Sequence, residues 1–158
     1  MEVYDEFNYR NAKSVLKKEH PSLLEEIYSI LDDPKNKLDL TSEGKQRQIS
    51  KQLQNLFVDK SWEKEVSVYS IPELKYDLVK DKLPIEIEIG HKRLVYADFF
   101  EFLADYSNGH IKLGIMIVTG EPERFGHTWH NSLDSTKRKI KAIEKVFLVP
   151  LLAIAINP

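Results

Sequence analysis

The chain has 158 residues, of which 42% are hydrophobic and 30% are charged, and its formal net charge is −2. This balance is typical of a single folded domain and excludes a disordered chain, and no apolar run approaches the roughly 18–20 residues that span a bilayer. The absence of cysteine excludes disulfides, thiolate metal sites and cysteine nucleophiles.

The first third of the sequence is predicted to be helical. Apolar residues recur at helical spacing over residues 9–18, 23–31 and 41–57. Ser22, with Glu25 three positions later, has the pattern of a capping box, in which the two residues satisfy each other's backbone N–H groups. The second of these helices is therefore expected to begin after Ser22 and to end before Pro34.

After residue 62 the apolar residues alternate with polar ones, as they do in strands. Strands are expected over residues 65–69, 74–79 and 83–89, with a tight connection at Asp81 and Lys82. The remaining elements are a helix, a strongly apolar strand, a polar segment, a second helix and a final strand, over residues 95–106, 111–118, 119–133, 134–147 and 149–156.

This order of elements predicts an α/β fold with a mixed central β-sheet flanked by helices. We expect one domain over residues 1–158, with helices in residues 1–60 and the sheet core in residues 61–158.

Three acidic residues form the candidate chemical site. Residues i and i+2 of a strand share a face, so Glu86 and Glu88 project together, away from the isoleucines that alternate with them. If the preceding strand pairs with theirs, Asp77 approaches both, and carboxylates grouped in this way bind hard cations such as Mg²⁺. By spacing alone, a half-exposed strand with its glutamates in water is the commoner explanation.

The context of these acids resembles the BamHI/BglII group of type II restriction endonucleases, within the PD-(D/E)xK nuclease superfamily. In that group an Asp strand precedes a Glu-x-Glu strand, a short polar stretch and a helix, and here residues 90–93 and 94–106 follow Glu88. The resemblance covers residues 40–157, including the apolar strands and a helix followed by Trp62. The wider superfamily usually has Lys at the position of Glu88, whereas the BamHI-type variant has Glu.

The resemblance implies a restriction-endonuclease-like three-layer domain that hydrolyses DNA with Mg²⁺, for which Mn²⁺ would substitute. It implies that Asp77, Glu86 and the backbone carbonyl of Ile87 hold the metal and that the products carry a 5′ phosphate. Glu88 would bind a second metal or act as a general base. Members of the group often carry a further acid on the preceding helix, and Glu43 is the candidate here.

Two polar segments are candidates for contact with double-stranded DNA, one directly after the acidic strand and one before the last helix. Arg in such a segment is well shaped for guanine in the major groove. The residues predicted to contact DNA are His91, Lys92, Arg93, Arg124, His127, Thr128 and Asn131. Because a palindromic site mirrors protein symmetry, we expect a homodimer.

Other functions stay open at the level of sequence. A net charge of −2 weakly opposes DNA binding, since released counterions supply much of the affinity of basic proteins. A repair or mobile-element nuclease, a non-catalytic DNA-binding or assembly domain, and a plain structural domain are the alternatives. The acidic start and the lack of cysteine predict a cytoplasmic protein with no membrane partner.

Overall fold

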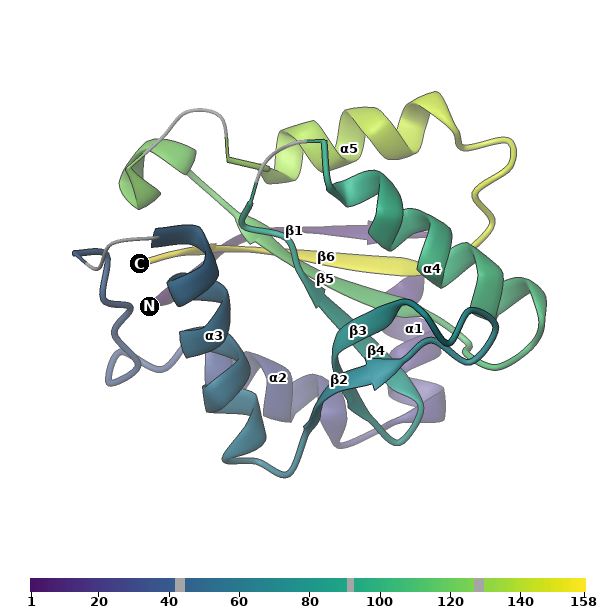
Figure 1. The fold of residues 1–158 in the computed structure, drawn as a ribbon, viewed down its shortest axis with the longest axis horizontal. Helices are drawn as coiled ribbons and strands as arrows, with labels where there is room; N and C mark the ends of the chain where they lie inside the picture. The colour runs from purple at the N-terminus through teal and green to yellow at the C-terminus, as the bar shows by residue number, and fades with distance from the viewer. Residues whose placement is uncertain (42–44, 91–92, 127–129) are drawn as a thin grey trace.

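The computed structural model describes residues 1–41, 45–90, 93–126 and 130–158, and a six-stranded mixed sheet lies at the centre of this part of the chain (Figure 1). The strands are β1 (Glu2–Tyr9), β2 (Glu63–Ser67), β3 (Lys75–Lys80), β4 (Leu83–Ile87), β5 (Gly114–Thr119) and β6 (Leu151–Asn157). The helices are α1 (Ala12–Glu19), α2 (Leu23–Leu31), α3 (Lys45–Val58), α4 (Val95–Ser107) and α5 (Leu133–Ala142), with a 3₁₀ helix at Pro122–Phe125.

The strands lie in the order β1-β6-β5-β4-β3-β2. The central strands β4, β5 and β6 are parallel, whereas β1 on one side and β3 and β2 on the other are antiparallel to their neighbours. Parallel central strands are buried on both faces, which explains the nearly continuous apolar sequence of β5 and β6.

Helices cover both faces of the sheet, so the protein has three layers (Figure 1). One core lies between the sheet and α1, α2 and α3, and it includes Ile85 and Ile87 of β4. The other core lies between the sheet and α4 and α5, and it includes Met116 and Val118 of β5. The predicted α/β class with a mixed, helix-flanked sheet is confirmed.

Strand β1 was not expected, because the region before residue 60 was predicted to hold helices only. It pairs with β6 along its length and forms one edge of the sheet. Its sequence, EVYDEFNY, is rich in acids and none of its eight residues is fully buried, so no apolar alternation identifies it as a strand. Pairing with an apolar neighbour decides the conformation of such a segment.

The capping-box prediction at Ser22 is wrong. Ser22 precedes α2, but its backbone is already helical and its side chain makes no capping hydrogen bond. The predicted last helix also ends earlier than expected, since α5 stops at Ala142 and turns lead from it to β6. None of the described helices has the length and apolarity that a membrane-spanning helix requires.

A two-residue turn sets the register of β3 and β4. Asp81 and Lys82 both have positive φ, 51° and 64°, as the central residues of a type I′ hairpin do. The strands pair Lys80 with Leu83 and Leu78 with Ile85, and the same register continued by one step places Asp77 opposite Glu86. The tight connection predicted at Asp81 and Lys82 is confirmed.

Helix α4 is held close against the sheet. A Cβ atom on Gly114 of β5 would lie 2.7 Å from the Phe102 ring of α4, so only glycine allows this approach. The Tyr76 hydroxyl of β3 donates to Asp105 Oδ2 at 2.9 Å and to the Glu101 carbonyl at 3.2 Å. These contacts fix the inner face of α4 beside the acidic end of β3 and β4.

Candidate active site

Asp77 and Glu86 meet between adjacent strands, as the sequence predicted. One Asp77 oxygen accepts the backbone N–H of Ile87 at 2.7 Å, and the other accepts the Gln54 amide of α3 at 2.7 Å. Glu86 lies within hydrogen-bonding reach of Asp77. Because Ile85 and Ile87 point into the core of α1–α3, Glu86 points to the opposite side, toward α4.

Glu88 lies directly beyond β4 and belongs to the same group. Its backbone N–H continues the sheet by donating to Ile117 at 2.9 Å, and its carboxylate accepts a hydrogen bond from the Gly90 backbone. Its side chain is 7% exposed and that of Glu86 is 6% exposed. The alternative in which these glutamates only solvate a strand is therefore wrong, since both side chains are buried.

Helix α4 adds two carboxylates that the sequence analysis did not predict. Glu101 lies within hydrogen-bonding reach of Glu86, and Asp98 within reach of Glu88. Glu101 is buried despite its charge. The five acids that converge here are Asp77, Glu86, Glu88, Asp98 and Glu101.

The carboxylates oppose one another's ionisation. Burial is the largest influence and raises the pKa of each of the five, and like charge from neighbouring acids adds to it for all of them. The pKa of Glu88 is raised to about 7, and the pKa values of Glu86 and Asp98 lie well above their ordinary range. Such a group of acids has a strong electrostatic preference for a bound cation.

The donors fit a hard divalent cation. Oxygen ligands suit Mg²⁺, and one buried oxygen each of Glu86, Asp98 and Glu101 has no hydrogen-bond partner. Within the described residues, however, no three His, Asp or Glu side chains are close enough and suitably oriented to coordinate one metal ion. The carboxyl groups pair with each other instead, so we expect cation binding to rotate these side chains.

Several residues predicted for the site lie outside the described residues. These are Glu43, the candidate acid on the preceding helix, and the candidate DNA contacts His91, Lys92, His127 and Thr128. The described side chain of α3 that reaches Asp77 is Gln54, an amide rather than an acid.

Arg93 lies within the described residues. It is an exposed residue just before α4, three positions after Gly90, whose backbone contacts Glu88. Its predicted contact with DNA stays a prediction.

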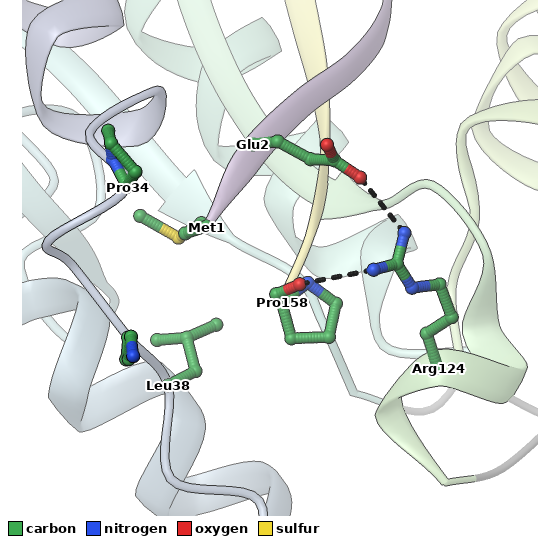
Figure 2. A pocket seen from close by; sticks show the side chains of 7 residues that line it. Met1, Glu2, Pro34, Leu38, Arg124 and Pro158 are labelled. Atoms are coloured by element: carbon green, nitrogen blue, oxygen red, sulfur yellow. Dashed lines mark hydrogen bonds and ion pairs between the residues drawn. The ribbon is translucent and has the colours of Figure 1, made fainter.

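Arg124 lies on the other side of β5 from the acids. Its guanidinium contacts Glu2 Oε1 at 2.9 Å, Glu121 Oε2 at 3.5 Å and the Pro158 carbonyl at 3.3 Å. Figure 2 shows the contacts with Glu2 and Pro158 at a pocket of about 440 Å³ where β1 and the end of the chain meet. In this structure Arg124 joins the two ends of the described chain.

Asn131 is fully buried, unlike a residue that reads DNA bases at a surface. Its backbone N–H donates to the Gly90 carbonyl at 2.9 Å, and its side-chain amide donates to Thr136 Oγ1 at 3.0 Å. Its carbonyl accepts hydrogen bonds from the N–H and hydroxyl of Thr119. Asn131 thus connects the end of β5, the start of α5 and the segment after Glu88.

The acids of α4 follow a pattern in the sequence that could have identified them. Asp98, Glu101 and Asp105 recur at spacings of three and four, so they share one helix face. That face is turned inward, while Tyr96 and Phe100 are exposed. Buried acids on a helix with exposed aromatics reverse the usual arrangement and indicate a functional surface.

A family model described as restriction endonuclease BglII/BglIII matches residues 4–156 of the chain. The chain belongs to this restriction endonuclease family. The family is one of type II site-specific deoxyribonucleases, and the chain is accordingly an enzyme of that class. The interpretation as a plain structural domain is excluded on this ground.

A comparison with solved structures agrees with the family. The chain is similar to the structure described as the restriction endonuclease BglII complexed with a DNA 16-mer, with a TM-score of 0.73 and 17% sequence identity. The match covers 99% of this chain and 76% of that one, which confirms the restriction-endonuclease fold. No curated protein sequence matches the chain.

Proposed function

We propose that this restriction endonuclease uses Mg²⁺ to hydrolyse phosphodiester bonds at a palindromic site in double-stranded DNA, as a homodimer. The observation that carries the proposal is the meeting of Asp77 and Glu86 across the β3–β4 hairpin, with Glu88 beside them. Buried carboxylate oxygens without a partner support a cation at this point.

The residues have distinct proposed roles. Asp77, Glu86 and the Ile87 carbonyl hold the cation, and the Ile87 N–H and Gln54 fix the Asp77 carboxylate for this task. Glu88 orients the attacking water on the side of the site that faces Gly90. When bound, a divalent cation would supply positive charge to the scissile phosphate and lower the pKa of the attacking water. We expect Mn²⁺ to substitute for Mg²⁺ in this role. Hydrolysis then leaves a 5′ phosphate.

The segment after Glu88 and the segment before α5 are the proposed DNA-contacting regions. Arg93 is the described residue best placed for this role, because it is exposed and lies near the acids. His91, Lys92, His127 and Thr128 are proposed from the sequence. We leave Asn131 out of the direct contacts, because its side chain is buried and engaged within the protein.

An apolar face on α4 and on the segment after α5 supports the proposed homodimer. Tyr96, Phe100, Val146 and Leu148 are 50–66% exposed. A shallow hollow of about 170 Å³ among them is lined by Tyr96, Phe99, Phe100, Leu103, Ile143, Val146 and Phe147. Clustered exposed aromatic side chains of this kind mark interaction surfaces. A second copy related by a two-fold axis would cover this face and bring two sites onto one duplex.

The proposal is tested by incubating purified protein with phage and plasmid DNA, in Mg²⁺ and in EDTA. We expect discrete fragments that require Mg²⁺, and sequencing of their ends gives the site and its symmetry. The Glu86→Ala variant should yield no fragments. An Arg138→Ala variant, which changes an exposed residue of α5, serves as the purification control.

The outcomes separate the parts of the proposal. Fragments that persist in EDTA or in Glu86→Ala would overturn the assignment of the acids. Discrete ends without two-fold symmetry would overturn the palindromic site and with it the functional reason for a dimer.

A further inference from the structure

Lys139 of α5 is a half-buried cation that two elements hold in place. Its ammonium donates to Asn131 Oδ1 at 3.0 Å and lies 5.5 Å from the centre of the Tyr96 ring. An ammonium over an aromatic face is attracted by the ring's negative charge density. One contact therefore comes from the segment before α5 and the other from the first turn of α4.

The contact with Asn131 leads to Glu88. Asn131 bonds the Gly90 carbonyl through its N–H at 2.9 Å, and the Gly90 backbone bonds the Glu88 carboxylate. In agreement with this placement, the positive charge of Lys139 opposes the rise that burial causes in the pKa of Glu88.

The positive charge of Lys139 is placed beside a group of five acids. The five acids raise one another's pKa, and the positive charge of Lys139 acts against this rise at Glu88. Neighbouring lysines of the same helix point elsewhere: Lys137 bonds Asp5 of β1, and Lys141 is exposed. Glu88 itself stands where the wider superfamily usually has its lysine, so no cation comes from β4.

We propose that Lys139 is a positioning residue of the cleavage site, whose ammonium holds the Glu88 carboxylate and the Gly90–Asn131 junction in place beside the scissile phosphate. This inference rests on the proposed function. Lys139 acts through Glu88 and not on the reacting atoms. Its charge, rather than only its hydrogen bond to Asn131, is what the site requires.

The alternative is that Lys139 only holds Asn131 in place through its hydrogen bond. Conservative variants of Lys139 distinguish this structural role from the proposed role of its charge. Lys139→Gln keeps a donor for Asn131 but removes the charge, whereas Lys139→Arg keeps both. Lys141→Gln removes the same charge from an exposed position on the same helix and is the matched control. Each protein is measured for single-turnover cleavage in Mg²⁺, Mn²⁺ affinity by calorimetry without DNA, and melting temperature.

We expect Lys139→Gln to cleave about 10- to 100-fold more slowly, less than the roughly 100- to 1000-fold cost of losing a direct transition-state contact, because Lys139 acts through Glu88. It should bind Mn²⁺ several-fold more tightly, because a like charge has been removed from beside the cation, and it should melt within a few degrees of the wild type. Lys139→Arg should restore cleavage to within about threefold of the wild type. Lys141→Gln should match the wild type in all three measurements.

Wild-type cleavage by Lys139→Gln would overturn the inference. So would a Lys139→Arg variant as slow as Lys139→Gln, or a fall in melting temperature and Mn²⁺ affinity together, which is the result of a lost brace. If the wild type cleaves no DNA, the proposed function fails by itself. The Mn²⁺ affinities then decide about Lys139 separately, since unchanged affinity in Lys139→Gln would place its charge away from the acids.

Discussion

The carboxyl groups of Glu86 and Glu101 face each other between β4 and α4, and each keeps one buried oxygen without a hydrogen-bond partner. The Tyr76 hydroxyl of the neighbouring strand β3 bonds the Glu101 carbonyl and Asp105 and so attaches α4 to the sheet. The backbone of α4 at Glu101 is therefore held beside the strands that carry the other acids. Ionisation of both carboxyl groups creates a repulsion at this point that a divalent cation would relieve.

The first prediction concerns the metal-free protein, whose stability should fall as the pH rises from 5 to 8. These carboxyl groups have higher pKa values in the folded protein than in the unfolded chain. Their ionisation therefore costs no folding free energy below about pH 4.5, and the free energy of unfolding falls as the pH rises through their folded-state pKa values. For Glu88, the rise from 4.5 to about 7 corresponds to about 3 kcal/mol at the upper end. Urea unfolding in EDTA at each pH measures the effect.

Glu101→Gln is the matched variant for this test, because it removes one acid without changing a proposed metal ligand. It should flatten the decline of stability with pH, and Mg²⁺ should flatten the decline in the wild type. A metal-free wild type that is equally stable at pH 5 and pH 8 would contradict the electrostatic account of the site.

A second prediction concerns the attachment of α4. Tyr76→Phe should lower the free energy of unfolding by about 1–3 kcal/mol, because it leaves the buried Asp105 with one donor fewer. Asp105 still accepts the N–H groups of Tyr69 and Ser70, so the helix should remain in place. Tyr69→Phe, at an exposed position, is the control and should change little. Equal stability of both variants would show that the Tyr76 hydroxyl contributes nothing.

The sequence could group Asp77, Glu86 and Glu88 because they lie on or directly beyond one short hairpin. Asp77, Glu86 and Glu88 are linked by strand alternation and by a two-residue turn, both of which are local properties that a sequence displays. The resemblance to a nuclease family then separated them from ordinary solvated glutamates.

What the sequence did not reveal depends on contacts between distant segments. Glu101 and Lys139 reach the site from α4 and α5, and helical periodicity gives only the face that each residue occupies. Likewise β1 is a strand because β6 pairs with it, some 150 positions later in the chain. Burial of Asn131 follows from the meeting of β5, α5 and the segment after Glu88, which no local pattern encodes.

The third prediction tests the apolar face of α4 as the dimer surface. Phe100→Glu should weaken self-association by at least about tenfold, because it buries a charge against the aromatic side chains of the second copy. Tyr69→Glu introduces the same charge at another exposed aromatic position and should leave association unchanged. Sedimentation equilibrium measures both. A wild type that stays monomeric at high concentration, or two variants with equal effect, would rule out this surface.

The turn that sets the register gives a fourth prediction. Lys82→Gly should raise the free energy of unfolding by about 1 kcal/mol, because a side chain at positive φ is strained and glycine is not. Lys82→Ala removes the same long side chain but keeps Cβ, so it should bring no such gain. Urea unfolding of both variants decides the point, and an equal gain in both would mean that the backbone conformation is not its cause.

The fifth prediction separates the charge of Asp77 from its structural contacts. Asp77→Asn should reduce cleavage by at least about 100-fold, the scale of one lost preorganised charge contact. It should leave the fold intact, because the amide oxygen of Asn can still accept the Ile87 N–H. Its amide nitrogen can donate to Gln54 once the Gln54 side-chain amide flips and presents its oxygen. Asp77→Ala offers no such replacement and should cost about 1–3 kcal/mol of stability through the unpaired donors. Cleavage rates and urea unfolding of the two variants are measured side by side. If Asn and Ala lower stability equally while Asn retains cleavage, Asp77 is a structural residue and the cation must be held by the glutamates alone.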